Sequence, residues 1–176
     1  MKVLAVCGSP RRNGNTEGLL RLALEEIEKH GIETELLLLA GRNVKPCVGC
    51  YGCIQRKDGT CTQTDPEFDE LALKFHDIDG LLLGSPVYFG SATAQISALM
   101  DRVAFLNRAG GPNHLTRRAG ASIAVARRAG ENFTFAQLNY YFGILDMFTV
   151  GSSYWNVAIA RQAGEFEKDK EGVETV

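Results

Sequence analysis

The chain has 176 residues, enough for one domain with a sizeable core, and its 45% hydrophobic and 23% charged residues are typical of a globular protein. The formal net charge of -2 gives no reason to expect a nucleic-acid or anionic-membrane partner. The longest aliphatic run, residues 36–40, is too short to cross a bilayer, and residues 1–6 lack the length and cleavage site of a signal peptide. We therefore expect a single cytoplasmic domain over residues 1–176.

The first predicted strand, residues 2–7, is apolar and rich in β-branched residues, as buried parallel strands are. A helix follows and ends near Gly31, with an apolar face at i, i+3, i+4 and i+7 spacing: Leu20, Ala23, Leu24 and Ile27. The loop between them, residues 8–16, therefore opens onto a helix N-terminus, where unpaired N–H groups and the helix dipole attract phosphate. The candidate phosphate ligands are Ser9, Asn13, Gly14, Asn15 and Thr16.

The spacing of residues in this loop indicates which class of phosphate-containing ligand it could bind. A nucleoside-triphosphate loop needs a lysine after its second glycine, but Asn15 follows Gly14, and the spacing from Gly8 is one residue too long. A dinucleotide fingerprint is absent as well, since neither glycine has a partner two residues away. A single terminal phosphate remains, as in FMN; the alternative is an ordinary polar turn with a capping Asn or Thr.

The second strand, residues 32–39, leads into a cysteine-rich loop, residues 41–65, without apolar periodicity. It carries four thiols, Cys47, Cys50, Cys53 and Cys61. Consecutive two-residue spacings in a cytosolic protein favour a metal over disulfides. Three thiolates in one tight loop with a fourth further on fit a [4Fe–4S] cluster better than structural zinc, which takes two separated Cys-x2-Cys pairs.

The remaining elements continue the alternation of strands and helices. We expect strands at residues 80–84, 119–126 and 147–151, with a helix beginning at Pro66 and others after residues 90 and 130. Their apolar faces are Phe68, Leu71, Ala72 and Phe75; Ile96, Leu99, Met100 and Val103; and Phe135, Leu138, Phe142 and Leu145. Residues 164–170 are charged, and residues 171–176 look like the first turn of a helix. Either the closing helix is missing or another surface covers that face of the sheet.

Two further loops follow predicted strands. The first comprises Ser85, Pro86, Val87, Tyr88, Phe89 and Gly90. Its aromatic rings and free N–H groups would suit an isoalloxazine edge, although such aromatics are more often core or turn residues. In the second loop, Arg127 and Gly130 follow the fourth strand. A positive charge there would suit a reduced flavin or the 2′-phosphate of NADPH; the alternative is a solvated surface arginine.

Together these motifs identify a family resemblance. Gly8-Ser9-Pro10-Arg11 with Gly14-Asn15-Thr16 is similar to the first loop of the flavodoxin-like NADPH-dependent FMN reductase family, and Ser85–Gly90 resembles its second flavin loop. The resemblance adds Arg11 to the candidate flavin ligands. The cysteine run resembles the iron–sulfur flavoprotein branch of that family. The similarity extends from Lys2 to about Gly151.

The expected fold class is α/β: a flavodoxin-like doubly wound sheet of five parallel strands in the order 2-1-3-4-5, with the cysteine-rich insertion after strand two. In such a sheet ligands bind at the carboxyl ends of the strands, between strands one and three, where the three loops would converge. The agreement of topology and motifs predicts a flavin site there.

The expected function is that of an FMN-binding redox enzyme that transfers electrons between flavin and a [4Fe–4S] cluster, with NAD(P)H as a candidate donor. Two alternatives stay open. One is an NAD(P)H-dependent FMN or quinone reductase with free thiols, since relatives carry a similar cysteine run without a cluster. The other is a non-enzymatic flavodoxin-like carrier. No acid–base catalytic pair is predicted. We expect a small-molecule or ferredoxin-like redox partner, and the resemblance implies a homo-oligomer, a dimer or tetramer.

Overall fold

The computed structural model describes all residues, 1–176, and contains one parallel sheet. Its strands are β1 (Lys2–Cys7), β2 (Glu33–Leu38), β3 (Gly80–Pro86), β4 (Ala119–Ala126), β5 (Phe148–Thr149) and β6 (Val157–Ile159). They run in the order β2-β1-β3-β4-β5, and β6 also pairs with β4. The predicted order 2-1-3-4-5 is thus confirmed.

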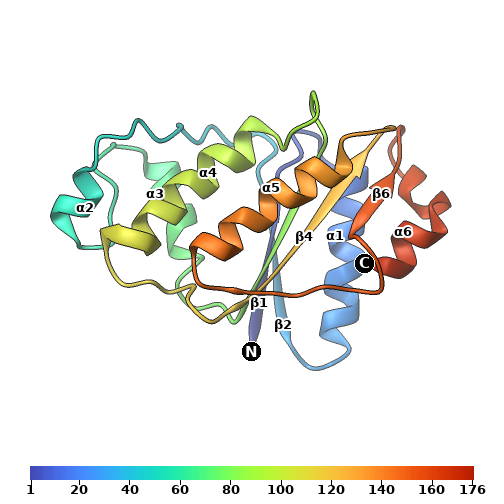
Figure 1. Ribbon diagram of the computed structural model, residues 1–176, viewed down its shortest axis with the longest axis horizontal. Coiled ribbons are helices and arrows are strands. Elements are labelled where there is room, and N and C mark those ends of the chain that lie inside the picture. The colour runs from blue at the N-terminus through green and yellow to red at the C-terminus, as the bar shows by residue number, and fades with distance from the viewer.

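Helices cover both faces of the sheet (Figure 1). On one face lie α3 (Pro66–Leu73), α4 (Ala94–Phe105) and α5 (Glu131–Ile144). On the other lie α1 (Asn15–Glu28) and α6 (Lys170–Thr175). The predicted apolar faces account for this packing, because Leu20, Leu99 and Phe142 are all fully buried against the sheet. No helix is long and apolar enough to cross a membrane.

The fifth strand differs from the prediction of residues 147–151. Only Phe148 and Thr149 pair with the start of β4. The chain then leaves the sheet over residues 150–156 and returns as β6, which pairs with the carboxyl end of β4. A three-residue strand after a Gly-Ser-Ser turn is too short to show a period of its own in the sequence. Because β6 pairs with the carboxyl end of β4, residues 160–163 reach the carboxyl edge of the sheet.

The closing helix is present, although short. A 3₁₀ turn, η2 (Glu165–Lys168), precedes α6. Phe166 of this turn packs onto α1 so closely that a Cβ on Gly18 would lie 2.2 Å from its ring. Two other short elements were not predicted: α2 (Gly52–Arg56) inside the cysteine-rich loop, and the π-helical turn η1 (Leu106–Gly110), which continues α4.

Candidate functional site

A pocket of about 440 Å³ lies at the carboxyl ends of the strands, and its size falls in the usual range for ligand sites. Four segments line it: the loop after β1, the loop after β3, the end of β4 and the stretch after β6. Its lining comprises Ser9, Arg11, Arg12, Gly14, Asn15, Thr16, Pro86, Val87, Tyr88, Val125, Arg127, Ala160, Arg161, Gln162 and Ala163. The sequence-predicted loops therefore do converge.

Gly8 sets where the first loop leaves the sheet. A Cβ at Gly8 would lie 2.8 Å from the Cβ of Ile96, so only glycine allows α4 to come this close. The Thr93 hydroxyl at the start of α4 donates to the Gly8 carbonyl at 2.6 Å. One residue on, Ser9 is buried, and its hydroxyl accepts the Arg11 N–H at 3.1 Å. The loop is thereby held against the pocket.

Asn13 does not line the pocket and instead shapes the turn. Its φ is 54°, in the left-handed region that asparagine tolerates better than most residues. The Asn13 N–H donates to Glu17 at 2.7 Å, while Arg21 donates to the other carboxylate oxygen at 3.0 and 2.8 Å. Glu17 is only 2% exposed. This buried carboxylate supports the loop, and no sequence pattern marks it.

Asn15 lines the pocket, but its amide is already engaged. It donates to the Gln162 carbonyl at 2.8 Å and accepts the Phe166 N–H at 3.4 Å. Asn15 therefore ties the stretch after β6 to the first loop. Gly14 and Thr16 remain beside the pocket at the first turn of α1, where backbone N–H groups lack helical partners.

The loop after β3 divides into a pocket-lining part and a projecting tip. Pro86, Val87 and Tyr88 line the pocket. Ser85 is buried behind them, with its hydroxyl accepting the Thr93 N–H at 3.0 Å, so its role in this structure is to hold the loop. Phe89 and Gly90 form the tip, with φ values of 51° and 80°, and Phe89 is fully exposed. The loop projects above the carboxyl edge of the sheet (Figure 1).

Gly130 lies outside the pocket, directly before α5, and allows the segment between β4 and α5 to approach the loop after β3. Its φ is 95°, and a Cβ there would lie 2.8 Å from Val87 Cγ1. Arg127, three residues earlier, lines the pocket directly.

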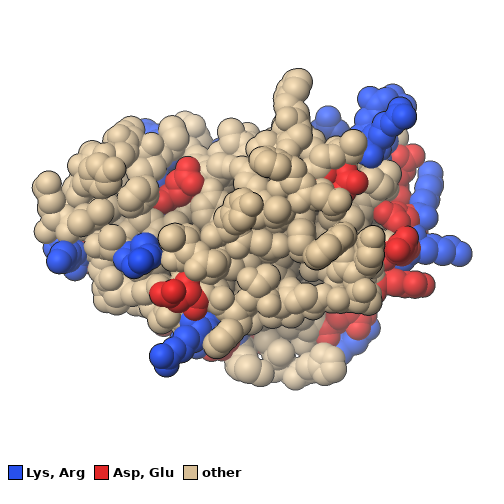
Figure 2. Space-filling model, viewed as in Figure 1, with Lys and Arg blue, Asp and Glu red and all other residues tan.

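The pocket edge is strongly cationic. Arg11, Arg12, Arg127 and Arg161 all line it, and none of them forms an ion pair. Basic side chains gather at the corner of the molecule above β6, and basic and acidic side chains are mixed along the same end below it (Figure 2). Arg12 and residues 160–163 were missing from the predicted site. Arg12 is in the phosphate loop and could have been included, but residues 160–163 reach the pocket only through β6.

The four cysteines of the second predicted site also come together. Cys47, Cys50, Cys53 and Cys61 are free thiols and line one small pocket beside α2 and α4. This pocket lies at the opposite end of the molecule from α6 (Figure 1). The thiols do not form a ready coordination shell, since no three His, Cys, Asp or Glu side chains are arranged to hold a metal ion.

The surroundings of the thiols differ. A hydrogen bond with the Thr62 hydroxyl, 3.3 Å away, and the Gly52 N–H lower the pKa of Cys50. Burial raises the pKa of Cys53. The Gly49 N–H donates to the Cys47 sulfur at 3.5 Å. The donor set is therefore the one that iron–sulfur clusters use, four thiols with N–H groups near sulfur, although the sulfur positions are not those of a complete ligand shell.

A profile of the NADPH-dependent FMN reductase family matches residues 1–162. The chain belongs to this family. It is accordingly a flavin-dependent oxidoreductase, and its pocket lies where the family resemblance of the two loops predicts a flavin.

Relatives place the chain in the iron–sulfur flavoprotein branch of the family. It is 39% identical to an iron–sulfur flavoprotein of Methanocaldococcus jannaschii over 99% of this chain and 91% of that protein. It is 31% identical to an iron–sulfur flavoprotein of Methanosarcina thermophila over 100% of this chain and 90% of that protein. A solved archaeal flavodoxin superposes with a TM-score of 0.60 at 14% identity, covering 98% of this chain and 94% of that one, which supports the flavodoxin-like fold.

Proposed function

We propose that the chain binds FMN in the pocket at the carboxyl edge of the sheet, takes electrons from NAD(P)H and passes them through a [4Fe–4S] cluster to a redox partner. One observation carries the proposal. A single pocket unites a phosphate-binding type of loop with a loop of apolar surface, and four thiols line a second pocket in the same domain.

The first loop would hold the phosphate of FMN. The opening N–H groups of α1 and its dipole attract an anion, and the Ser9 and Thr16 side chains line the same space. The unpaired arginines at the edge add positive charge. The loop has no second glycine turn for a pyrophosphate, which favours FMN over FAD.

The second loop would hold the ring. Pro86, Val87 and Tyr88 present a surface against which a flat heterocycle can lie, and Arg127 supplies a positive charge beside it. Bound flavin supplies hydride chemistry: it accepts two electrons and can release them singly. The side chains position the ring and limit water around it. None needs to act as an acid or base for hydride transfer.

The four cysteines would hold the cluster, which supplies one-electron transfer. The thiol-only donor set and the N–H group near Cys47 sulfur favour this centre. A second candidate function is an NAD(P)H-dependent flavin or quinone reductase with free thiols. The absence of an arranged ligand shell favours it. A third candidate function is that of a flavodoxin-like carrier, which transfers electrons without oxidising NAD(P)H.

Anaerobic purification followed by chemical analysis separates these functions. Flavin released by heat is chromatographed, and iron and sulfide are assayed per chain. We expect FMN with iron and sulfide in equal amounts; FAD as the main flavin would contradict the phosphate-loop argument. A protein that contains FMN but no iron would support the reductase with free thiols. Failure to oxidise NADH or NADPH in steady-state assays would support a non-enzymatic electron carrier.

We also propose that a second copy of the chain covers the exposed side of α5. Large apolar side chains are exposed there and on the segment that follows: Phe133, Tyr140, Ile144, Phe148, Tyr154 and Trp155. The face of the molecule that bears α5 carries few charges (Figure 2). An uncharged, apolar helix face is typical of a helix that is covered in the assembly. Light scattering of the purified protein gives the subunit number, expected to be two or four.

A further inference from the structure

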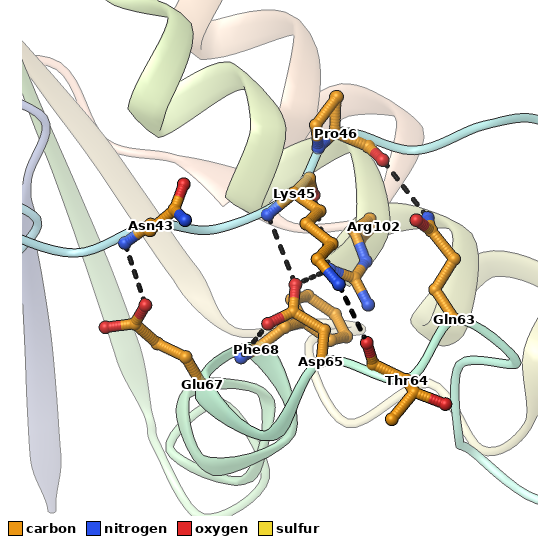
Figure 3. A network of polar contacts seen from close by, with 9 residues as sticks. All are labelled: Asn43, Lys45, Pro46, Gln63, Thr64, Asp65, Glu67, Phe68 and Arg102. Atoms are coloured by element: carbon orange, nitrogen blue, oxygen red, sulfur yellow. Dashed lines mark hydrogen bonds and ion pairs between the residues drawn. The ribbon is translucent and has the colours of Figure 1, made fainter.

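Arg102 of α4 is an unusual buried residue. It is the largest fully buried side chain, 2% exposed. Its Nη1 donates to Asp65 at 2.5 Å and to the Lys45 carbonyl at 3.2 Å, and its guanidinium lies 3.6 Å from the Phe68 ring centroid (Figure 3). Burial works to raise the pKa of the Asp65 carboxyl, but hydrogen bonds from Arg102 and two backbone N–H groups hold it below its usual value.

These contacts leave part of the guanidinium unused. Nε and Nη2 are buried and have no hydrogen-bond partner. Buried donors without partners are rare, because each forfeits the hydrogen bonds it made with water. Arginine carries five N–H donors, so the Asp65 pair satisfies only one side of the group. The free donors require an acceptor that the protein chain does not itself provide.

The location of Arg102 indicates what that acceptor is. Arg102 lines the same pocket as Cys47, Cys50, Cys53 and Cys61, and it is the only charged side chain among the residues that line it. A cluster held by four thiolates is an anion whose sulfur atoms accept hydrogen bonds, and its potential depends on such bonds and on nearby charge.

We propose that Arg102 raises the reduction potential of the centre that the cysteines hold, with its Nε and Nη2 groups donating hydrogen bonds to sulfur and its charge favouring the reduced form. This inference rests on the proposed cluster. Reduction adds one electron and one negative charge to the centre. A buried cation beside the sulfurs therefore stabilises the reduced form more than the oxidised form, because its attraction to the centre grows with the negative charge of the centre.

The test compares Arg102→Gln with Asp65→Asn in the reconstituted, FMN-loaded protein. Both changes break the same ion pair and should lower the urea midpoint, but they remove opposite charges. The cluster is titrated with dithionite, which supplies the electron and is oxidised to sulfite, and the reduced form is followed by electron paramagnetic resonance. In Arg102→Gln we expect the equilibrium constant for reduction to fall at least tenfold, about 59 mV for a one-electron couple. In Asp65→Asn we expect the reduction potential of the cluster to stay unchanged or to rise, because this change removes a negative charge.

An unchanged potential in Arg102→Gln, or a fall of equal size in both variants, would overturn the inference, since it would leave Arg102 a purely structural role. If Arg102→Gln does not fold or load, Arg102→Lys decides. It keeps the charge but lacks the forked donors, and a potential equal to that of the wild type would overturn the hydrogen bonds to sulfur. Wild-type protein that binds FMN but holds no iron after reconstitution would instead refute the proposed cluster, a failure distinct from the others.

Discussion

Thr16 is only 2% exposed, yet it lines the proposed flavin pocket at the first turn of α1. If its hydroxyl donates to the FMN phosphate, Thr16→Ala removes a charge-assisted hydrogen bond, worth about 1.5–3 kcal/mol. We expect the FMN dissociation constant, measured by flavin fluorescence quenching, to rise roughly tenfold to a hundredfold. Thr116→Ala, at an exposed position, is the matched control and should bind FMN as the wild type does. Equal affinities in the two variants would place the phosphate elsewhere.

His76 and His114 are far apart in the sequence but stack in the structure, with ring centroids 4.1 Å apart. Burial, with the charge of His114, lowers the pKa of His76. The folded state therefore resists protonation, so stability is full above the ordinary histidine pKa of about 6.5 and is lost as pH falls below it. When the pH is lowered from about 7.5 to about 5.5, we expect the urea midpoint of His76→Gln to fall less than that of the wild type. His30→Gln, at an exposed position, should keep the wild-type loss. A loss in His76→Gln as large as that of the wild type would show that other groups dominate.

The loop after β3 depends on Gly130, the glycine directly before α5. Gly130 has a φ of 95°, and a Cβ there would lie 2.8 Å from Val87, whereas Gly31 has a φ of 73° with nothing within 4 Å. Gly130→Ala and Gly31→Ala should therefore share a backbone strain of about 1–2 kcal/mol, and Gly130→Ala should lose more stability in urea unfolding because its Cβ also collides with Val87. Only Gly130→Ala should also displace Val87 and weaken FMN binding, by about tenfold or more. Parallel effects on FMN binding would mean that the contact with Val87 does not shape the pocket.

Across the whole domain the two proposed centres occupy separate segments, because the cysteines follow β2 while the flavin loops follow β1 and β3. Cys50→Ala should thus keep stoichiometric FMN and a folded core but lose iron and one-electron transfer to ferredoxin. Cys7→Ala serves as the control for loss of a thiol. Cys7 is buried in β1, away from the cysteine pocket, so this variant should hold as much iron as the wild type. Iron, flavin and electron transfer are assayed in protein prepared without oxygen. Undiminished one-electron transfer in Cys50→Ala would contradict the cluster as the exit for electrons.

Much of this protein could be predicted from local patterns. The apolar run of β1, the glycine-bearing loop and the periodic face of α1 are each encoded within a few residues, because strand and helix periods depend on neighbouring side chains. The alternation of such units predicted the sheet order, and with it the convergence of the loops after β1, β3 and β4. The two-residue cysteine spacings likewise predicted that the thiols would share one site.

Only the tertiary structure could supply the contacts between distant segments. Gln162 reaches the pocket because a three-residue strand rejoins the sheet and Asn15, 147 residues away in the chain, binds its carbonyl. Arg102 appears in the sequence as one more charged residue of a helix, and no period distinguishes it. The fold buries it against Asp65 and the cysteine pocket, where its unpaired donors become significant. Burial and pairing of this kind depend on which faces meet, and local sequence does not encode that.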